Sequence, residues 1–326
     1  MRLSLALEQG AVSLPGEGRI LLMRPPADAD LPPMPPARLA IHQPFKPAAD
    51  ALGDRGIVDP MDVPAVDGGA VIYVPRSKRL ARDLVARAVA ALPEGAPVVV
   101  DGDKADGVES LLRACRGTFA VGDVFSKAHG KTFSFPAPAA APDGWLAPPE
   151  RVEGWTLRAG VFSADGPDPG SVMLARALPP LKGTVCDLGA GWGYLSVRLL
   201  AASPEVTACE LVEADHDALL CAEANVTDDR AGFAWADATA YAGGPFDAVV
   251  CNPPFHPSRK ADPGLGRAFI ATAARNLAPR GRAWFVANRH LPYEAALRDA
   301  FAEVVVRAEG GGYKVVEAAR PVRRRR

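Results

Sequence analysis

The sequence lacks any long hydrophobic run. No stretch is long enough to span a bilayer, and Glu8 and Gln9 interrupt the few apolar residues near the start. We therefore expect neither a membrane-spanning protein nor an exported one, and we place the chain in the cytoplasm.

Cysteine is scarce, and its positions form no pattern. The five cysteines, at 115, 186, 209, 221 and 251, include no C-x-x-C pair and make an odd count. Disulfide frameworks and zinc sites use paired cysteines at short spacings. We expect reduced thiols in the core, and neither disulfides nor a bound metal.

The sequence also lacks an excess of positive charge. It has 37 Lys and Arg against 38 Asp and Glu, whereas a nucleic-acid-binding domain is typically basic. Any contact with RNA must therefore come from local patches. The candidates are a first patch of Arg76, Lys78, Arg79 and Arg82, and a tail of Arg320 with residues 323–326. The tail is equally consistent with a solvated, disordered end.

The composition predicts two domains. With 326 residues, of which 48% are hydrophobic, the chain exceeds a typical single domain. Residues 135–144 are rich in proline and alanine, which is typical of a linker. We place the domains at 1–145 and 146–326. Periodicity in the first domain predicts a helix over 77–92, a strand over 96–101 and a helix over 107–115. Residues 1–69 show little periodicity, and we assign them no fold.

A glycine-rich loop lies between a strand and a helix in the second domain. Residues 183–188 have the pattern of a buried strand, residues 189–193 are G-A-G-W-G, and helical spacing follows. Glycines let a backbone approach a ligand closely, and a helix N-terminus offers free N–H groups to a carboxylate. The nicotinamide fingerprint is G-x-G-x-x-G. This loop differs from it, because its last glycine, Gly193, is followed by the bulky Tyr194.

Two further strand ends carry acids that complete a ligand site. Glu213 ends a strand-like run about 20 residues after the glycine loop, where it can bind a ribose. Glu210 is a second candidate inside that strand, and either acid could instead be an exposed charge at a strand edge. Asp237, followed by Ala238, ends another run and could accept from an adenine amino group. Groups for carboxylate, ribose and adenine together predict S-adenosylmethionine. Its methionine end is then expected against Asp187, Gly189, Gly191 and Gly193.

A turn with the sequence N-P-P-F follows the strand-like run 246–251. An exocyclic amine is a poor nucleophile, because its lone pair is delocalised into the adjoining π system. The Asn252 side-chain oxygen and the Pro253 carbonyl could accept its two N–H bonds and favour a pyramidal nitrogen. Phe255 could stack on the ring. His256 could contact the base or its phosphate, help remove the proton, or be an ordinary surface residue. Without its neighbours, the turn could also be a plain exit from a strand.

Several segments resemble one methyltransferase family. The turn with His256, together with residues 161–171 upstream and 286–293 downstream, resembles the ribosomal RNA guanine-N2 methyltransferases of the RsmC and RlmG type. Residues 73–78 and 313–316 are also similar to segments of that family. The resemblance implies an α/β class I methyltransferase, with a twisted seven-stranded sheet that ends in an antiparallel hairpin. It also implies a smaller, degenerate methyltransferase-like domain before it, which has lost cofactor binding and supports substrate recognition.

The resemblance also implies an activity. We expect direct transfer of the methyl group of S-adenosylmethionine to guanine N2 in ribosomal RNA, most of all small-subunit RNA, without a metal or a covalent enzyme intermediate. The partner is ribosomal RNA or a ribosomal subunit, and we expect a monomer. Two alternatives remain open. The Asn-Pro-Pro-aromatic turn is shared with adenine-N6 and glutamine methyltransferases, and a noncatalytic assembly factor could keep the same fold.

Overall fold

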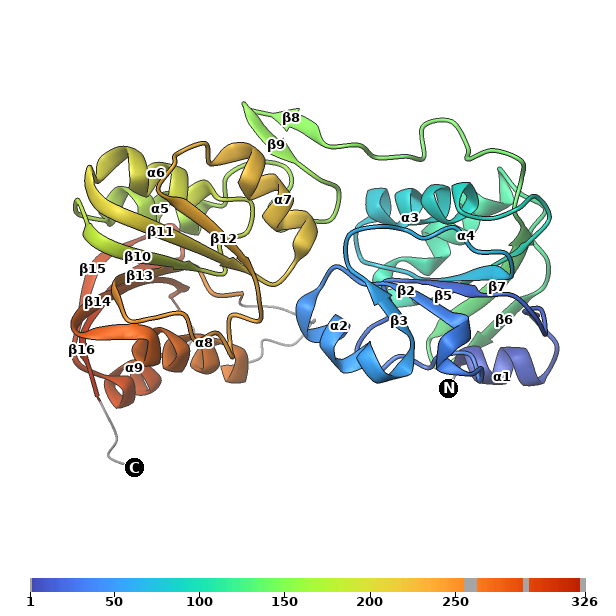
Figure 1. Cartoon of the computed structure of the whole chain (residues 1–326), viewed down its shortest axis with the longest axis horizontal. Coiled ribbons are helices and arrows are strands. Elements are labelled where there is room, and N and C mark those ends of the chain that lie inside the picture. Colours follow the sequence, from blue (N-terminus) through green and yellow to red (C-terminus); the bar gives the residue numbers. More distant parts are fainter. Residues whose placement is uncertain (1, 255–262, 290–292, 323–326) are drawn as a thin grey trace. The chain divides into compact units, whose positions relative to one another are not determined.

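The structure is a computed structural model that describes residues 2–254, 263–289 and 293–322 (Figure 1). The chain forms two compact units. The N-terminal unit comprises Met1–Pro149 and Arg158–Gly160, and the C-terminal unit comprises Glu150–Leu157 and Val161–Arg326. Each unit contains a seven-stranded sheet.

The N-terminal unit is an α/β fold with strand order β3-β2-β1-β4-β5-β7-β6. The first 69 residues, to which the sequence assigned no fold, supply its first three strands. Strand β4 and the first four residues of β5 are continuous apolar runs, as expected for strands buried on both faces. The elements are α1 (Arg2–Glu8), β1 (Ile20–Met23), β2 (Leu39–His42), α2 (Lys46–Leu52), β3 (Ile57–Asp59), β4 (Gly69–Tyr73), α3 (Lys78–Ala90), β5 (Pro97–Asp103), α4 (Val108–Arg116), β6 (Val124–Lys127) and β7 (Gly130–Pro136), with short 3₁₀ turns at Pro36–Arg38, Gly53–Arg55 and Lys104–Asp106.

The helices and the strand predicted for this unit are confirmed within one to two residues at most ends. Ser77 caps α3, because its side chain accepts the N–H of Leu80. The proline-rich stretch differs from expectation at its start. Phe135 and Pro136 still belong to β7, where they pair with Val98 and Pro97, so the irregular connection begins only after them. Proline is tolerated there because it ends the strand.

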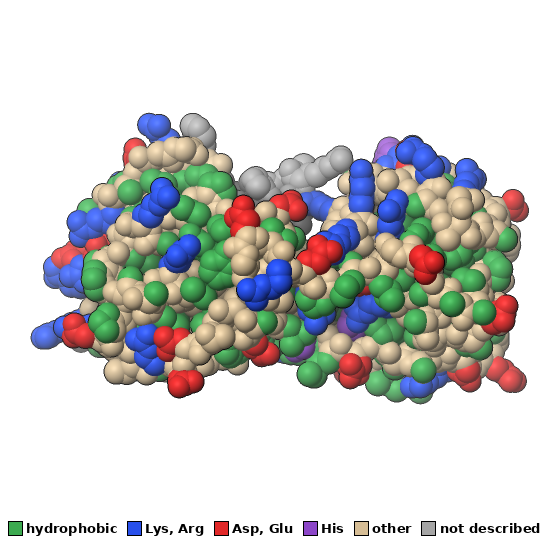
Figure 2. All heavy atoms as spheres, turned by 90° about the horizontal axis from the view of Figure 1, so that it is seen from above, with side chains coloured by type: hydrophobic (Ala, Val, Ile, Leu, Met, Phe, Trp, Pro, Cys, Tyr) green, Lys and Arg blue, Asp and Glu red, His purple; other side chains and the backbone are tan. Residues whose placement is uncertain are grey.

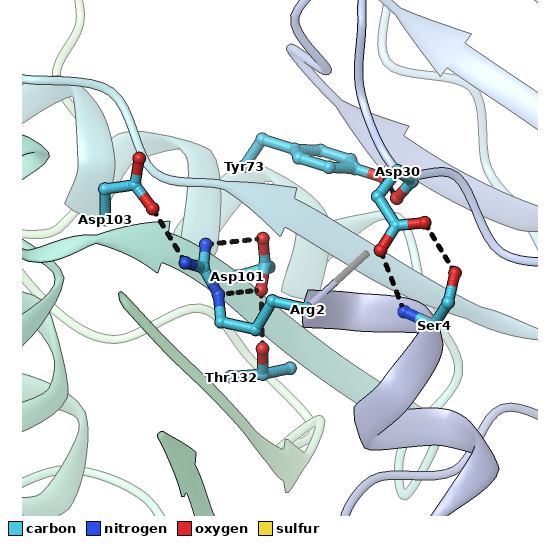
Figure 3. Close-up of polar contacts among 7 residues, drawn as sticks. All are labelled: Arg2, Ser4, Asp30, Tyr73, Asp101, Asp103 and Thr132. Carbon is cyan, nitrogen blue, oxygen red and sulfur yellow. Dashed lines mark hydrogen bonds and ion pairs between the residues drawn. The ribbon is translucent and has the colours of Figure 1, made fainter. Parts of the chain in front are cut away.

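The start of the chain fills the carboxyl edge of this sheet (Figure 3). The Arg2 guanidinium donates to Asp101 on β5 at 2.8 Å and to Asp103 at 2.7 Å, and Thr132 on β7 donates to Asp101 at 2.5 Å. The Tyr73 hydroxyl, at the end of β4, donates to the carbonyl oxygen of Asp30 at 2.9 Å. Doubly wound folds bind their ligands at this edge. In the N-terminal unit, side chains of the protein itself occupy it.

The C-terminal unit repeats the topology of the first, with strand order β12-β11-β10-β13-β14-β16-β15. Strand β16 runs antiparallel to both β14 and β15, so the closing hairpin and the seven-stranded class I sheet expected from the sequence are confirmed. The elements are β8 (Glu150–Val152), β9 (Trp155–Leu157), α5 (Pro169–Ala177), β10 (Lys182–Leu188), α6 (Tyr194–Ala202), β11 (Glu205–Glu213), α7 (His216–Asn225), β12 (Ala231–Trp235), β13 (Phe246–Cys251), α8 (Pro263–Asn276), β14 (Leu277–Asn288), α9 (Glu294–Ala300), β15 (Phe301–Gly310) and β16 (Tyr313–Pro321).

Helices cover both faces of this sheet, with α5 and α6 on one side and α8 and α9 on the other (Figure 1). The two cores follow the period of two along a strand. On β10, Val185 belongs to the core that contains Leu174 of α5, whereas Cys186 belongs to the core that contains Phe269 of α8. One predicted strand is shorter than expected: β12 ends at Trp235, so Asp237 lies in the turn beyond it.

All five cysteines are buried in the cores, as expected from the sequence. No helix among the described residues is both long and apolar enough to cross a bilayer. Within the same residues, no group of three or more His, Cys, Asp and Glu side chains is arranged to hold a metal ion.

Replacing Arg2 with alanine should destabilise the N-terminal unit by about 3–5 kcal/mol, because Asp101 would stay buried without its cation. The two side chains are only 10% and 11% exposed. The matched control is Lys46→Ala, which removes an exposed ion pair with Asp50 in the same unit and should change stability by less than about 1 kcal/mol. Urea unfolding of the full chain measures both. Equal shifts for the two variants would contradict a structural role for Arg2.

Candidate functional site

A pocket opens at the carboxyl edge of the C-terminal sheet. It is lined by residues 189–192 of the glycine loop, the start of α6, Asn252 after β13, and the upstream residues Phe162, Ser163, Asp168 and Ser171. The pocket therefore combines the glycine loop with the Asn-Pro-Pro turn.

Strand register brings these two sequence motifs together. Strands β10 and β13 are parallel neighbours, and Asp187 pairs with Val250. Two residues further along each strand, Gly189 and Asn252 leave the sheet side by side. On the other side of β10, Leu188 pairs with Val212, so Glu213 leaves the sheet at the same edge. Residues more than 60 positions apart in the chain thus share one edge because the strands are parallel.

The side-chain amide of Asn252 is held in one orientation. Its nitrogen donates to a carboxylate oxygen of Asp168 at 3.0 Å and to the hydroxyl oxygen of Ser171 at 2.8 Å. An ionised carboxylate can only accept, so the nitrogen of the amide must face Asp168. The carbonyl oxygen is consequently turned away from Asp168, and no described residue donates to it. Asn252, which lines the pocket, therefore keeps a fixed acceptor without a partner among the described residues.

Asp168 and Ser171 are site residues for which the sequence predicted no role, although their segment was part of the family resemblance. Asp168 is the N-cap of α5, where its side chain accepts the N–H of Ser171 at 2.8 Å, and Pro169 takes the first helical position. The D-P-G-S pattern is recognisable in sequence as a helix start. Its second contact, with Asn252, lies 84 residues away and has no local signal.

Gly170 shows how closely the downstream segment approaches this site. A Cβ atom there would lie 2.9 Å from the ring of Tyr313 and 2.9 Å from the carboxylate of Asp168. Any side chain at this position would displace one of the two. The upstream segment and the start of β16, which the resemblance singled out separately, are therefore in direct contact beside Asn252.

The glycines of the loop are needed for different reasons. Gly193 has φ +88° and a Cβ atom there would meet Val226 at 2.6 Å, so it serves the packing of α6 on α7. Gly191 has φ +56° and faces open space, with no atom within 4 Å of a Cβ. Of the three glycines, Gly189 and Gly191 line the pocket and Gly193 does not. A ligand can approach the backbone closely at Gly191.

Glu213 holds the glycine loop through a hydrogen bond. Its carboxylate accepts the N–H of Gly191 at 2.8 Å, of Ala214 at 2.7 Å and of Asp215 at 2.8 Å. Burial raises the pKa of this carboxyl, against the effect of these N–H groups. A carboxylate has about four acceptor positions, so Glu213 keeps capacity for a ribose hydroxyl. The rival acid, Glu210, instead accepts from the hydroxyl of Tyr241 at 2.7 Å.

Asp187 lies behind the pocket and not in its lining. The side chain is completely buried on β10, and one oxygen accepts from the Ser196 hydroxyl at 2.7 Å. The other oxygen, Oδ1, has no hydrogen-bond partner among the described residues. Burial, with the nearby charge of Glu213, raises the pKa of Asp187 to about 7 although the Ser196 hydrogen bond opposes it. A nearby cation would favour the ionised form of this carboxyl.

Asp237 and Ala238 lie beyond the end of β12. One oxygen of Asp237 accepts from both the N–H and the hydroxyl of Thr239, at 2.8 and 2.7 Å, and this turn fixes the carboxylate. Ala238 is buried in the same core as Val212. Neither lines the pocket, and their predicted contact with adenine stays a prediction.

Phe162 is a further pocket residue without a predicted role. Its carbonyl oxygen accepts from the indole N–H of Trp192 at 3.0 Å, which ties the upstream loop to the glycine loop. Its own side chain is 61% exposed. An exposed aromatic ring on an anchored backbone is a suitable surface for stacking. Trp192 itself is buried and packs on Trp155 and Tyr194.

The remaining predicted site residues are only partly described. Pro253 is buried at the start of the turn after β13. Phe255 and His256, predicted to stack on the base and to assist the reaction, lie outside the described residues.

Comparisons with known proteins show the family of the chain. The family model of the methyltransferase small domain matches residues 155–317. Proteins named ribosomal RNA small subunit methyltransferase C are similar over much of the chain: that of Shewanella sp. (strain MR-4) is 31% identical over 257 residues, and that of Shewanella halifaxensis is 32% identical over 260 residues. Each match covers 75% of both chains.

One solved structure is similar over almost the whole chain. It is described as the T. thermophilus 16S rRNA N2 G1207 methyltransferase (RsmC) in complex with AdoMet and guanosine. The TM-score is 0.79 and the sequence identity 24%, and the match covers 98% of this chain and 92% of the other. The likeness establishes the two-unit fold.

Replacing Asp187 with asparagine should remove a pH-dependent loss of stability. Because the folded pKa is about 7 and the ordinary value is 3.8, the native state holds the proton more tightly. Stability is then lost as pH rises from about 4 to above 7. The neutral variant should be more stable than the wild type at pH 8, by up to roughly 4 kcal/mol, and no more stable at pH 4. Urea unfolding without cofactor measures the difference, and parallel pH profiles would contradict it.

Proposed function

The chain belongs to the methyltransferase small domain family and to its RsmC type, and from this membership we propose that it transfers the methyl group of S-adenosylmethionine to the N2 amine of a guanine in ribosomal RNA. The observation that carries the proposal is the fixed amide of Asn252. Asp168 and Ser171 engage its nitrogen, which leaves its oxygen as an acceptor without a described partner, and the glycine loop lines the same pocket.

The residues present fit the cofactor. Gly191 leaves its Cα face open to a ligand, and Asp187 has a buried oxygen without a partner. We assign the methionine end to Asp187, Gly189, Gly191 and Gly193, the ribose to Glu213, and the adenine to Asp237 and Ala238. The bound cofactor supplies an electrophilic methyl group on its sulfonium. The protein supplies alignment and hydrogen-bond acceptors.

Asn252 and Pro253 are the groups that we expect to act on the guanine. An acceptor fixed beside an N–H bond favours the pyramidal form of the nitrogen, in which the lone pair is localised and can be aimed at the methyl group. Because Asp168 and Ser171 hold the amide before substrate binds, no reorganisation is needed at the moment of reaction. We assign stacking on the base to Phe255 and keep His256 as a contact or proton acceptor.

The choice of substrate rests on the relatives. Their names specify small-subunit ribosomal RNA, and the similar T. thermophilus structure is described as an N2 methyltransferase of 16S rRNA with guanosine. We propose the same class of substrate here, presented as ribosomal RNA or as a subunit in the cytoplasm to a monomeric enzyme. A guanine within a stacked helix must be turned out to reach the pocket, at a cost of a few kcal/mol. We assign substrate support to the N-terminal unit.

Labelling tests the reaction and the substrate together. The purified protein is incubated with tritiated S-adenosylmethionine and ribosomal subunits from cells that lack it, and the label is then mapped. We expect label on N2 of a guanine in small-subunit RNA. Label on adenine or on protein would replace the guanine assignment with another amine, and no label on any substrate would leave a noncatalytic binding protein.

Replacing Asn252 with alanine should lower kcat at least a hundredfold, because the transition state loses a fixed acceptor. Cofactor affinity should stay within about tenfold, or about 1.4 kcal/mol, since the glycine loop is unchanged. Single-turnover methylation and calorimetric titration of the cofactor measure the two effects. A variant that loses cofactor binding and keeps its turnover would overturn this division of roles.

Replacing Ser171 with alanine should lower kcat about tenfold while KM for RNA and cofactor affinity stay unchanged. The change removes one of the two contacts of the Asn252 amide, whereas Asp168 can still cap α5. Asp168→Ala removes both the other contact and the cap, and should lower kcat further.

The control for the lost cap is Ser77→Ala, which removes the N-cap of α3 in the N-terminal unit. It should cost about 1 kcal/mol of stability and leave kcat unchanged. A fall in kcat for this variant that matches that for Asp168→Ala would show that the effect is only structural.

A further inference from the structure

A second hollow lies at the amino edge of the C-terminal sheet, at the opposite ends of the strands from the pocket. Four of its lining side chains are basic: Lys182 at the start of β10, Arg280 and Arg282 on β14, and Arg307 on β15. Figure 2 shows Lys and Arg side chains, with Asp and Glu among them, over the C-terminal unit on the left. The sequence did not predict this cluster, because its members come from three separate strands.

Two of these arginines are held side by side by one buried carboxylate. Glu317 on β16 is 7% exposed, and it accepts from Arg307 at 2.5 Å and from Arg282. Burial alone would raise the pKa of Glu317, but the hydrogen bonds from the two guanidinium groups outweigh it and lower the pKa. Each guanidinium has five N–H donors. The two side chains are about half exposed, at 51% and 48%, so their remaining donors face solvent in a fixed arrangement.

The other two cations have no acidic partner among the described residues. Lys182 and Arg280 are both exposed, and no described ion pair includes them. The second acid of the hollow, Asp247, already accepts the N–H of Thr184 at 2.9 Å and its hydroxyl at 3.2 Å. Four cations therefore face two carboxylates, both engaged, in a chain whose net charge is −1. The local excess of positive charge is not explained by the ion pairs of the fold.

We propose that this basic hollow binds the phosphodiester backbone of the RNA that carries the target guanine. The proposal rests on the function proposed above. Arginine forks bind phosphate oxygens in pairs, and the carboxylate of Glu317 fixes two such forks before RNA arrives. Unpaired lysine and arginine beside them release counterions on binding. The chemistry suits a polyanion with spaced phosphates better than a single small anion.

The position of the hollow predicts what it contributes. β10 runs from Lys182 to Leu188, so at about 3.3 Å per residue the hollow lies roughly 20 Å from the glycine loop. Its side chains are too far away to touch the guanine in the pocket. They can hold flanking RNA, which affects binding of the substrate and leaves the methyl-transfer step unchanged. The predicted tail, residues 323–326, lies outside the described residues and is left intact in the tests below.

The test neutralises the two cations that have no structural ion pair. Lys182→Gln with Arg280→Gln forms the hollow variant. The control variant, Arg116→Gln with Lys127→Gln, removes the same charge from exposed positions of the N-terminal unit that lie outside its first patch, the candidate for RNA contact. Binding of a labelled small-subunit RNA fragment is measured by filter retention over a series of salt concentrations, without cofactor.

The hollow variant should bind the RNA about tenfold more weakly. The slope of log K against log salt should fall by about 1 to 2, because each lost phosphate contact removes roughly 0.7–0.9. Its kcat at saturating RNA and its cofactor affinity should equal those of the wild type, while KM for RNA rises. Equal behaviour of the hollow and control variants overturns the proposal.

Two further readouts separate this proposal from its rivals. Loss of affinity for polyglutamate, with RNA binding unchanged, would assign the hollow to an acidic protein and reject the RNA assignment. Because binding is measured without cofactor, the result is independent of methylation. If the hollow variant loses salt-dependent RNA binding, the basic hollow is supported even when the labelling experiment finds no labelled guanine. If a guanine is labelled and the hollow variant binds RNA normally, only the proposal for the basic hollow is rejected.

Discussion

Parallel pairing of β10 with β11 and β13 is the constraint on which the C-terminal unit depends. It places the ends of these strands at one edge, so the glycine loop, Glu213 and Asn252 leave the sheet beside one another. The same pairing gathers the opposite ends of the strands, where Lys182 lies. One edge thus carries a pocket with a fixed amide acceptor, and the other carries a basic hollow. We assign methyl transfer to the carboxyl ends of these strands and RNA binding to their amino ends.

The two units have the same strand order but differ at the carboxyl edge. In the C-terminal unit, glycines keep that edge open, and Gly191 faces empty space. In the N-terminal unit, the guanidinium of Arg2 lies between Asp101 and Asp103, and Tyr73 is bonded to the Asp30 segment (Figure 3). A buried ion pair of this kind contributes to the fold and leaves little room for a ligand. Topology alone therefore does not determine where a cofactor can bind.

Much of the C-terminal unit could be predicted from local patterns. Strand and helix periodicity, the glycine loop and the Asn-Pro-Pro turn are short-range signals, and they gave the strands β10, β11 and β13 nearly to the residue. The first 69 residues could not be assigned, because their strands are only three or four residues long. β1 and β2 are fully buried and show no alternation to detect, and β3 is too short and too exposed to show an apolar pattern. The end of β12 was placed too late because the apolar pattern continues past Trp235 into a turn that Asp237 forms with Thr239.

The sequence by itself determined the kind of chemistry, because that depends on residue types at short spacing: glycines after a buried strand, and an asparagine before two prolines. Only the tertiary structure decided how those groups are oriented. Three sets of hydrogen bonds join distant segments. Asn252 donates to Asp168 and Ser171, Gly191 donates to Glu213, and two arginines donate to Glu317. Such contacts follow from the register of neighbouring strands, and a local pattern contains no information about which distant side chain a strand end will meet.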